Sequence, residues 1–162
     1  IAYVEWGAPW SQHTIADWAV IDGPESAAKF AAALLAAPRM AESYNSISEA
    51  IFYSINLIET NQYEGRRKII DISGDGPQIN GRPLPEAKAL AMLNNITINA
   101  LVVYKPDGLL TGPFGEPLIE HYRKDVIGGR GAFAHIAEGR DQFAPAILKK
   151  MILEIAEAVR RE

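Results

Sequence analysis

Residues 68–76 of the chain have the sequence KIIDISGDG, and this stretch decides the expected fold. Isoleucines at positions 69, 70 and 72 put apolar side chains on both faces of a strand, which is typical of a buried parallel sheet. The loop that follows, 73–77, is rich in turn-forming residues. Ligands bind at the carboxyl ends of strands in such sheets, so Asp75 is the first candidate site residue.

Strand and helix patterns alternate on both sides of this stretch. In chain order they predict strands at 1–6 and 15–21, helices at 24–37 and from 47, a strand at 68–72, a helix at 84–93, a strand at 96–103, a helix at 116–126, a strand at 133–136 and a helix at 142–160. The short turn between the first two strands predicts antiparallel pairing. The expected fold class is therefore α/β: a doubly wound, mostly parallel sheet with one antiparallel edge strand and helices on both faces.

Composition narrows the classes of function. The 162 residues suit one domain, and 16 basic against 20 acidic residues give a net charge of −4, which argues against a nucleic-acid binder. Zero cysteines exclude disulfides and thiolate chemistry, and no apolar run is long enough to predict a membrane span. The three histidines, His13, His121 and His135, fall in separate elements without ligand spacing, and His121 is expected on a helix surface.

A second candidate stretch, 43–46, precedes the helix that begins at Ile47. Asn45 and Ser46 could ligate a cation, or they could cap the helix, with Glu49 closing a capping box from Ser46. Asp75 also has two interpretations. Its carboxylate could hold a divalent cation, or it could shape a tight turn by bonding to nearby backbone.

Together the two stretches resemble the von Willebrand factor A-like domain, and more narrowly a bacterial family of uncharacterised proteins with this fold. The resemblance rests on residues 2–6 (AYVEW), 18–23 (WAVIDG), 46–51 (SISEAI), 70–76 (IDISGDG) and 125–129 (DVIGG). It implies a metal-ion-dependent adhesion site (MIDAS) that holds Mg²⁺ or another divalent cation. Asp75 matches the family's aspartate, Asn45 stands where a threonine is usual, and Ser46 would complete part of the shell. The resemblance also favours an exported or periplasmic location.

The hypothesis for function is a non-enzymatic module that recognises a protein partner, in which a partner carboxylate meets the bound cation. A small metal-assisted α/β hydrolase using Asp75 and Asp71 is the alternative from another class, although no motif supplies its general base. A third interpretation is a domain whose metal site has decayed, because Asn45 replaces the usual hydroxyl. If the site exists, the loops of Asn45 and Asp75 should converge at one edge of the sheet.

The resemblance also predicts what the chain lacks. The family's Asp-x-Ser-x-Ser motif follows its first strand, and nothing in residues 1–162 matches that motif. The chain is therefore expected to be a single A-like domain without its first strand and first helix. That strand would lie between residues 1–6 and 68–72. Either an upstream segment or another chain supplies it, or residues 1–6 have moved inward and the sheet is rearranged; direct parallel pairing of 1–6 with 68–72 would contradict the first two alternatives.

Overall fold

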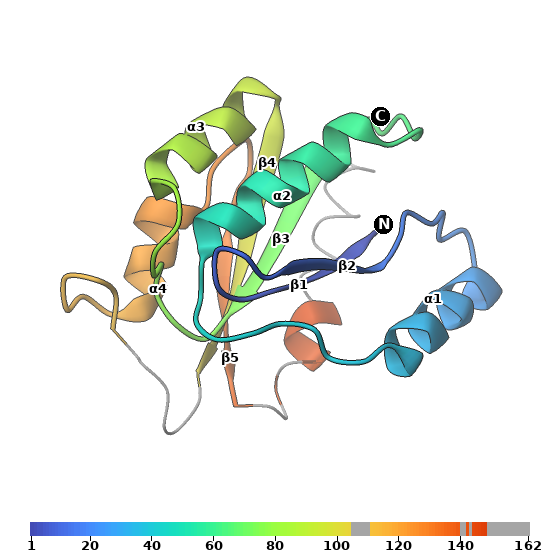
Figure 1. Ribbon diagram of the computed structural model, residues 1–162, viewed down its shortest axis with the longest axis horizontal. Helices are drawn as coiled ribbons and strands as arrows, with labels where there is room; N and C mark the ends of the chain where they lie inside the picture. The colour runs from blue at the N-terminus through green and yellow to red at the C-terminus, as the bar shows by residue number, and fades with distance from the viewer. Residues whose placement is uncertain (105–110, 140–141, 143, 149–162) are drawn as a thin grey trace.

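The computed structural model describes residues 1–104, 111–139, 142 and 144–148, and it is a mixed α/β structure (Figure 1). Its strands are β1 (Tyr3–Trp6), β2 (Gln12–Ala16), β3 (Lys68–Gly74), β4 (Ile96–Tyr104) and β5 (Ala134–Glu138). Its helices are α1 (Pro24–Ala36), α2 (Ile47–Thr60), α3 (Leu84–Leu93), α4 (Leu118–His121) and the π-helical turn η1 (Tyr122–Val126). The expected fold class is confirmed.

A three-stranded parallel sheet, ordered β3-β4-β5, forms the centre of the fold. Ile70 of β3 pairs with Ile98 of β4, and Val102 of β4 pairs with Ile136 of β5. The apolar runs that predicted buried parallel strands therefore lie side by side, because a strand covered on its faces must carry apolar residues without interruption.

Helices α2 and α3 lie next to each other over one face of this sheet (Figure 1). Ile47, Ile51 and Ile55 of α2 are buried, and their spacing of four residues puts them on one side of the helix. They pack in a single core with Ile70 and Ile72 of β3 and with Ala87 and Ala91 of α3. This core holds the amino end of α2 against the carboxyl end of β3, and that is the edge where the candidate residues lie.

Strands β1 and β2 form a separate antiparallel pair, in which Trp6 lies opposite Gln12. The second strand was expected at 15–21, and this range is wrong. The strand begins earlier because the loop 7–11 is tight, with Gly7 N–H donating to Ser11 O at 2.9 Å. The regular strand ends at Ala16, and beyond it the pairing with the first strand continues irregularly, since Ala19 N–H donates to Ile1 O at 2.8 Å.

The helix expected at 116–126 differs from the observed one in its start and in its helix type. The helix expected at 116–126 begins only at Leu118, because Glu116 closes a turn in which Gly112 N–H donates to its carbonyl at 2.7 Å. Its second half is the π-helical η1, where Ile127 N–H donates to Tyr122 O at 2.9 Å. Most of the helix expected at 142–160 lies outside the described residues.

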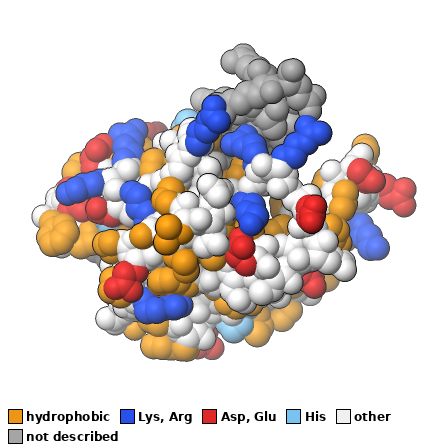
Figure 2. Space-filling view, turned by 90° about the horizontal axis from the view of Figure 1, so that it is seen from above, with side chains coloured by type: hydrophobic (Ala, Val, Ile, Leu, Met, Phe, Trp, Pro, Cys, Tyr) orange, Lys and Arg blue, Asp and Glu red, His pale blue; other side chains and the backbone are white. Residues whose placement is uncertain are grey.

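Helix α1 stands at one end of the molecule, away from the parallel sheet (Figure 1), and none of its residues is buried. On the face shown in Figure 2, basic and acidic side chains are interspersed with apolar ones. No helix in the described ranges combines the length and apolarity needed to cross a membrane.

Within the described residues, β1 pairs with β2 and β3 pairs with β4, and the two sheets stay separate. The direct pairing of 1–6 with 68–72 that would have contradicted the missing-strand expectation is therefore not found. The absence of a first strand and first helix from the domain stays a prediction.

Candidate functional site

Three loops meet beside the carboxyl end of β3: the β1–β2 loop, the segment before α2, and the segment after β3. Ser46 N–H donates to Gly7 O at 2.8 Å, and Ala8 N–H donates to Glu42 O at 2.9 Å. The loop after β3 joins them through Ile79 N–H, which donates to Asn45 O at 2.7 Å. Backbone bonds between segments 30 or more residues apart in the chain thus fix this edge in place.

Asn45 and Asp75 face each other across these loops. The Asn45 Nδ2 donates to Asp75 Oδ1 at 3.4 Å, and both side chains are half-buried. Gly76 permits this approach, because a Cβ at that position would overlap the Asn45 amide nitrogen. The expected convergence of the two loops is confirmed.

The pair has a separation that suits a shared cation. Two oxygen ligands at right angles lie about 2.9 Å apart around Mg²⁺ and about 3.3–3.7 Å apart around the larger Ca²⁺. Asn45 Nδ2 and Asp75 Oδ1 are 3.4 Å apart, a separation that matches the larger ion. Binding would require Asn45 to present its Oδ1 instead of its Nδ2, by a half-turn of the amide. The donor chemistry therefore fits a hard cation, and the role of Asp75 and Asn45 as its ligands stays a prediction.

Ser46, the third predicted ligand, is fully buried and turned toward a different part of the loop. Its Oγ donates to Asn80 O at 3.0 Å, and the structure shows no side-chain cap from Ser46 to α2. The capping box expected from Ser46 and Glu49 is therefore wrong. Its role as a metal ligand is a separate prediction that stays open.

Gln78, which the sequence did not single out, caps α2 in place of Ser46. Its Oε1 accepts the Ser48 N–H at 2.8 Å, and its Nε2 donates to Ser48 Oγ at 2.9 Å and to Asn80 O. One side chain thus satisfies a free amide at the helix start and holds the loop after β3 against α2. The two partners are 30 residues apart in the chain, so local spacing gave no signal for this cap.

Tyr122 lies beneath the loop that carries Asp75. It is completely buried, and its hydroxyl donates to Gly76 O at 3.0 Å. Burial raises the pKa of Tyr122 far above its usual range, and the nearby negative charge of Asp75 raises it further. The phenol therefore stays neutral and acts as a fixed donor that supports the Asp75 loop.

His121 is 3% exposed, so the expectation that it lies on the surface is wrong. Its Nδ1 is 2.9 Å from Asp125 Oδ2 and 3.9 Å from Glu116 Oε1. The three side chains form a group that could hold a metal ion. The spacing of His121 and Asp125, four residues apart on a helix, was a signal visible in the sequence.

The hydrogen bond of the other ring nitrogen of His121 opposes metal binding by this group. His121 Nε2 accepts the Gln78 backbone N–H at 3.2 Å, which places the proton of the neutral ring on Nδ1. Nδ1 then donates to Asp125. A metal ion at Nδ1 would have to displace that proton and turn Nε2 into a donor facing another donor. The observed bonding is that of a satisfied buried histidine.

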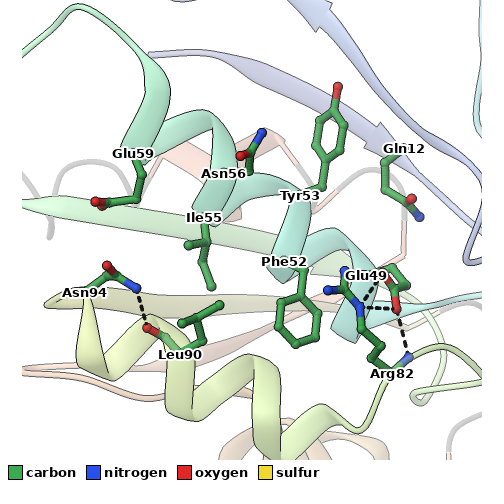
Figure 3. A pocket seen from close by; sticks show the side chains of 10 residues that line it. All are labelled: Gln12, Glu49, Phe52, Tyr53, Ile55, Asn56, Glu59, Arg82, Leu90 and Asn94. Carbon is green, nitrogen blue, oxygen red and sulfur yellow. Dashed lines mark hydrogen bonds and ion pairs between the residues drawn. The ribbon is translucent and has the colours of Figure 1, made fainter.

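A groove of about 540 Å³ runs between α2 and α3 (Figure 3). At one end the Arg82 guanidinium bonds both oxygens of Glu49, with the shortest contact at 2.6 Å, and lies 3.6 Å over the Phe52 ring. The bond to Arg82 lowers the pKa of the Glu49 carboxyl. Glu49 therefore ties the loop after β3 to α2, instead of closing the expected capping box.

The fold is von Willebrand factor A-like. Proximal thread matrix protein 1 (PTMP1) from the mussel byssus, solved with a zinc-occupied MIDAS motif, superimposes on 91% of the chain with a TM-score of 0.59 and 13% identity. The match covers 33% of that chain, so the present chain spans about a third of its length.

The chain belongs to the family described as "Protein of unknown function (DUF1194)", whose model matches residues 1–159. No curated protein matches the chain by sequence. The likeness to PTMP1 shows the fold, and the metal in that structure belongs to that protein.

Proposed function

We propose that the chain is a protein-binding module that recognises a partner at the edge formed by Asn45 and Asp75, with the help of a divalent cation. The observation that carries this proposal is the 3.4 Å approach of the two side chains on loops tied together by backbone bonds. The A-like fold supports the proposal, because such domains serve as interaction modules.

The cation would supply a positive charge that a carboxylate of the partner can meet. Asp75 would hold it with an anionic oxygen and Asn45 with its amide oxygen, and both are donors that Mg²⁺ accepts. Gly76 and Tyr122 keep the two loops in contact from below. The buried phenol lies close enough to Asp75 for the two to interact electrostatically.

Binding is a better proposal than catalysis for this edge. His121, the buried histidine nearest to the loop after β3, has both ring nitrogens engaged with Gln78 and Asp125. Asp71, the second carboxylate of the hydrolase alternative, is exposed in the middle of β3, three residues before the end of the strand. The strand from Asp71 to its end at Gly74 alone spans about 10 Å, and Asp75 lies one residue further on, so Asp71 is too far away to act together with Asp75 on one ion.

Metal binding tests the proposal. Mn²⁺ titration, followed by paramagnetic broadening of backbone NMR signals, should broaden residues around Asn45 and Asp75, and Asp75→Ala should abolish the effect. Asp71→Ala is the matched control, because it removes an exposed carboxylate from β3, the strand that leads into the Asp75 loop, and should leave the broadening unchanged. Broadening that survives in Asp75→Ala but disappears in Asp125→Asn would place the ion at the Glu116 group and overturn the proposal.

Stability of the same variant separates a ligand from a turn former. Asp75→Ala in metal-free buffer should cost less than about 2 kcal/mol, because it removes a half-exposed carboxylate with a long hydrogen bond to Asn45. A larger loss in urea unfolding would show that Asp75 mainly shapes the turn.

A further inference from the structure

A second pocket lies between the carboxyl end of α2 and the segment that follows β2. It has a volume of about 350 Å³, and residues of the range 57–63 line it together with Asp17 and Trp18. We call it the β2–α2 pocket. Helix α2 has 14 residues and is therefore about 21 Å long, and Asn45 lies before its other end. The pocket is thus separate from the Asn45–Asp75 edge.

Asn61, the residue that ends α2, shapes one wall of the β2–α2 pocket. Its Nδ2 donates to Leu57 O at 3.1 Å and to Ile58 O at 2.6 Å, and so satisfies two carbonyls of the last helical turn. Its Oδ1 accepts the Tyr63 N–H at 2.7 Å. One side chain therefore fixes the backbone that presents Gln62 and Tyr63, and this lowers the entropy that a ligand must remove on binding.

The pocket has an apolar part. The indole Nε1 of Trp18 is buried, and it meets no acceptor in the part of the chain that the structure describes. Because Nε1 is the sole polar atom of that side chain, any part of the indole that faces the pocket is carbon. Leu57 adds aliphatic surface from α2, and Tyr63, which is 42% exposed, adds a second aromatic ring.

Polar groups with unused hydrogen-bonding capacity lie beside this apolar surface. The Asp17 Oδ1 accepts the Trp18 N–H at 2.7 Å, which leaves the other carboxylate oxygen open. Among the described residues, no hydrogen bond engages that oxygen, the Gln62 amide or the Tyr63 hydroxyl. The carboxylate can only accept hydrogen bonds, whereas the amide and the phenol can both donate and accept them.

This set of groups distinguishes between classes of small ligand. An organic cation could meet Asp17 and the aromatic rings, but it cannot accept a hydrogen bond from Gln62 or Tyr63. An anion would be repelled by Asp17, and no lysine or arginine is among the described residues that line the pocket. A neutral ring with hydroxyl groups on its edge and C–H groups on its faces could use all of these groups at once.

We propose that the β2–α2 pocket binds a neutral pyranose sugar. Sugar hydroxyls donate to Asp17 and accept from Gln62 and Tyr63, while a C–H face of the ring covers the aromatic and aliphatic carbons. The volume is at the small end of ligand pockets, which suits a single ring. A ligand with about a dozen non-hydrogen atoms and ordinary ligand efficiency has a Kd of about 1 mM.

NMR titration of the ¹⁵N-labelled chain tests the proposal. The probes are the methyl glycosides of glucose, galactose, mannose and N-acetylglucosamine, each added up to 100 mM in buffer with EDTA. At least one sugar should shift the Trp18 indole signal and the backbone signals of 57–63 in a saturable way, with a Kd within tenfold of 1 mM. The Trp18 indole signal is identified by its loss in Trp18→Phe. Choline chloride and sodium acetate should each bind at least tenfold more weakly than the best sugar.

Variants assign the binding to this pocket. Gln62→Ala and Tyr63→Ala should each raise the Kd of the best sugar at least fivefold, and both side chains are exposed, so the fold seen in the spectrum should not change. Phe114→Ala is the matched control, because Phe114 is an aromatic residue outside the pocket that is 91% exposed. It should leave the Kd within twofold.

Three results would overturn the proposal. The first is that no sugar gives saturable shifts by 100 mM, and the second is that choline or acetate binds more tightly than the best sugar. The third is saturable binding that neither Gln62→Ala nor Tyr63→Ala weakens, because the sugar would then lie elsewhere. Asp75→Ala should leave the Kd of the sugar unchanged, since Asp75 lies beyond the other end of α2, and a loss of sugar binding in this variant would also contradict the assignment.

Discussion

Gly76→Ala should disrupt the contact between the two candidate loops. Gly76 does not have a positive φ, so alanine is compatible with its backbone. The new Cβ would lie closer than 3.0 Å to the Asn45 amide nitrogen, and the neighbour must move. Overpacking of this kind destabilises a protein by about 1–3 kcal/mol. Replacing glycine by alanine also lowers the conformational entropy of the unfolded chain, which offsets about 0.4–1 kcal/mol of that loss. We expect a net loss of about 1–2 kcal/mol.

A double-mutant cycle shows whether the loss comes from this contact. Asn45→Ala alone removes a long, half-exposed hydrogen bond to Asp75 and should cost about 0.5–1 kcal/mol. In the double variant the new methyl group no longer meets the amide, so the two losses should fail to add by about 1 kcal/mol. Gly65→Ala is the control, because its methyl group would meet only Arg67 O at 3.3 Å in an exposed loop.

Urea unfolding followed by circular dichroism measures all four free energies of unfolding, with the slopes checked for two-state behaviour. Additivity of the two substitutions within about 0.3 kcal/mol would refute the reasoning, because it would mean that Gly76 and Asn45 do not share a contact. The same cycle repeated with 10 mM MgCl₂ reports whether the metal depends on both residues.

Three more substitutions test the supports of the site, each by urea unfolding. Tyr122→Phe should lower the free energy of unfolding by about 1–2 kcal/mol at pH 7. The raised pKa of Tyr122 gives the wild-type protein a stabilisation that is complete below about pH 10 and falls above it. The difference in the free energy of unfolding between wild type and variant should therefore shrink at higher pH. Arg82→Gln should lower the free energy of unfolding by about 0.5–1 kcal/mol at pH 7. The lowered pKa of Glu49 means that the ion pair stabilises the protein above about pH 4.3 and that this stabilisation is lost as the pH falls. A stability difference between wild type and variant that persists at pH 2 would contradict the role of the ion pair. His121→Leu should cost about 1–3 kcal/mol by leaving the Gln78 N–H without its acceptor, and a neutral result would show that the histidine is not a structural link.

The sequence alone specified the central layer of the fold. The isoleucines of β3 and the apolar run of β4 have the pattern of buried parallel strands, and the four-residue spacing in α2 marks its buried side. These patterns are local, since each reflects how one element repeats its contact with the core. The approach of Asn45 to Asp75 followed from topology, because a helix start and the carboxyl end of a neighbouring strand meet at one edge.

The boundaries that failed depended on tertiary hydrogen bonds. The range of β2 is set by the tight loop that aligns Gln12 with Trp6, and the start of α4 by the turn at Glu116. Strand propensity in 15–21 could not reveal the range of β2, because propensity describes single residues and not the partner strand.

For the candidate site, too, the sequence predicted some features and only the tertiary structure determined the others. Residue types and order determined that Asp75 and Asn45 would be candidates. Only the folded chain determined that Gln78 caps α2, that Arg82 binds Glu49, and that His121 is buried. Each of the two pairings joins residues at least 30 positions apart, and the burial of His121 depends on how elements pack, so the identity of each partner is fixed by tertiary packing and not by local spacing.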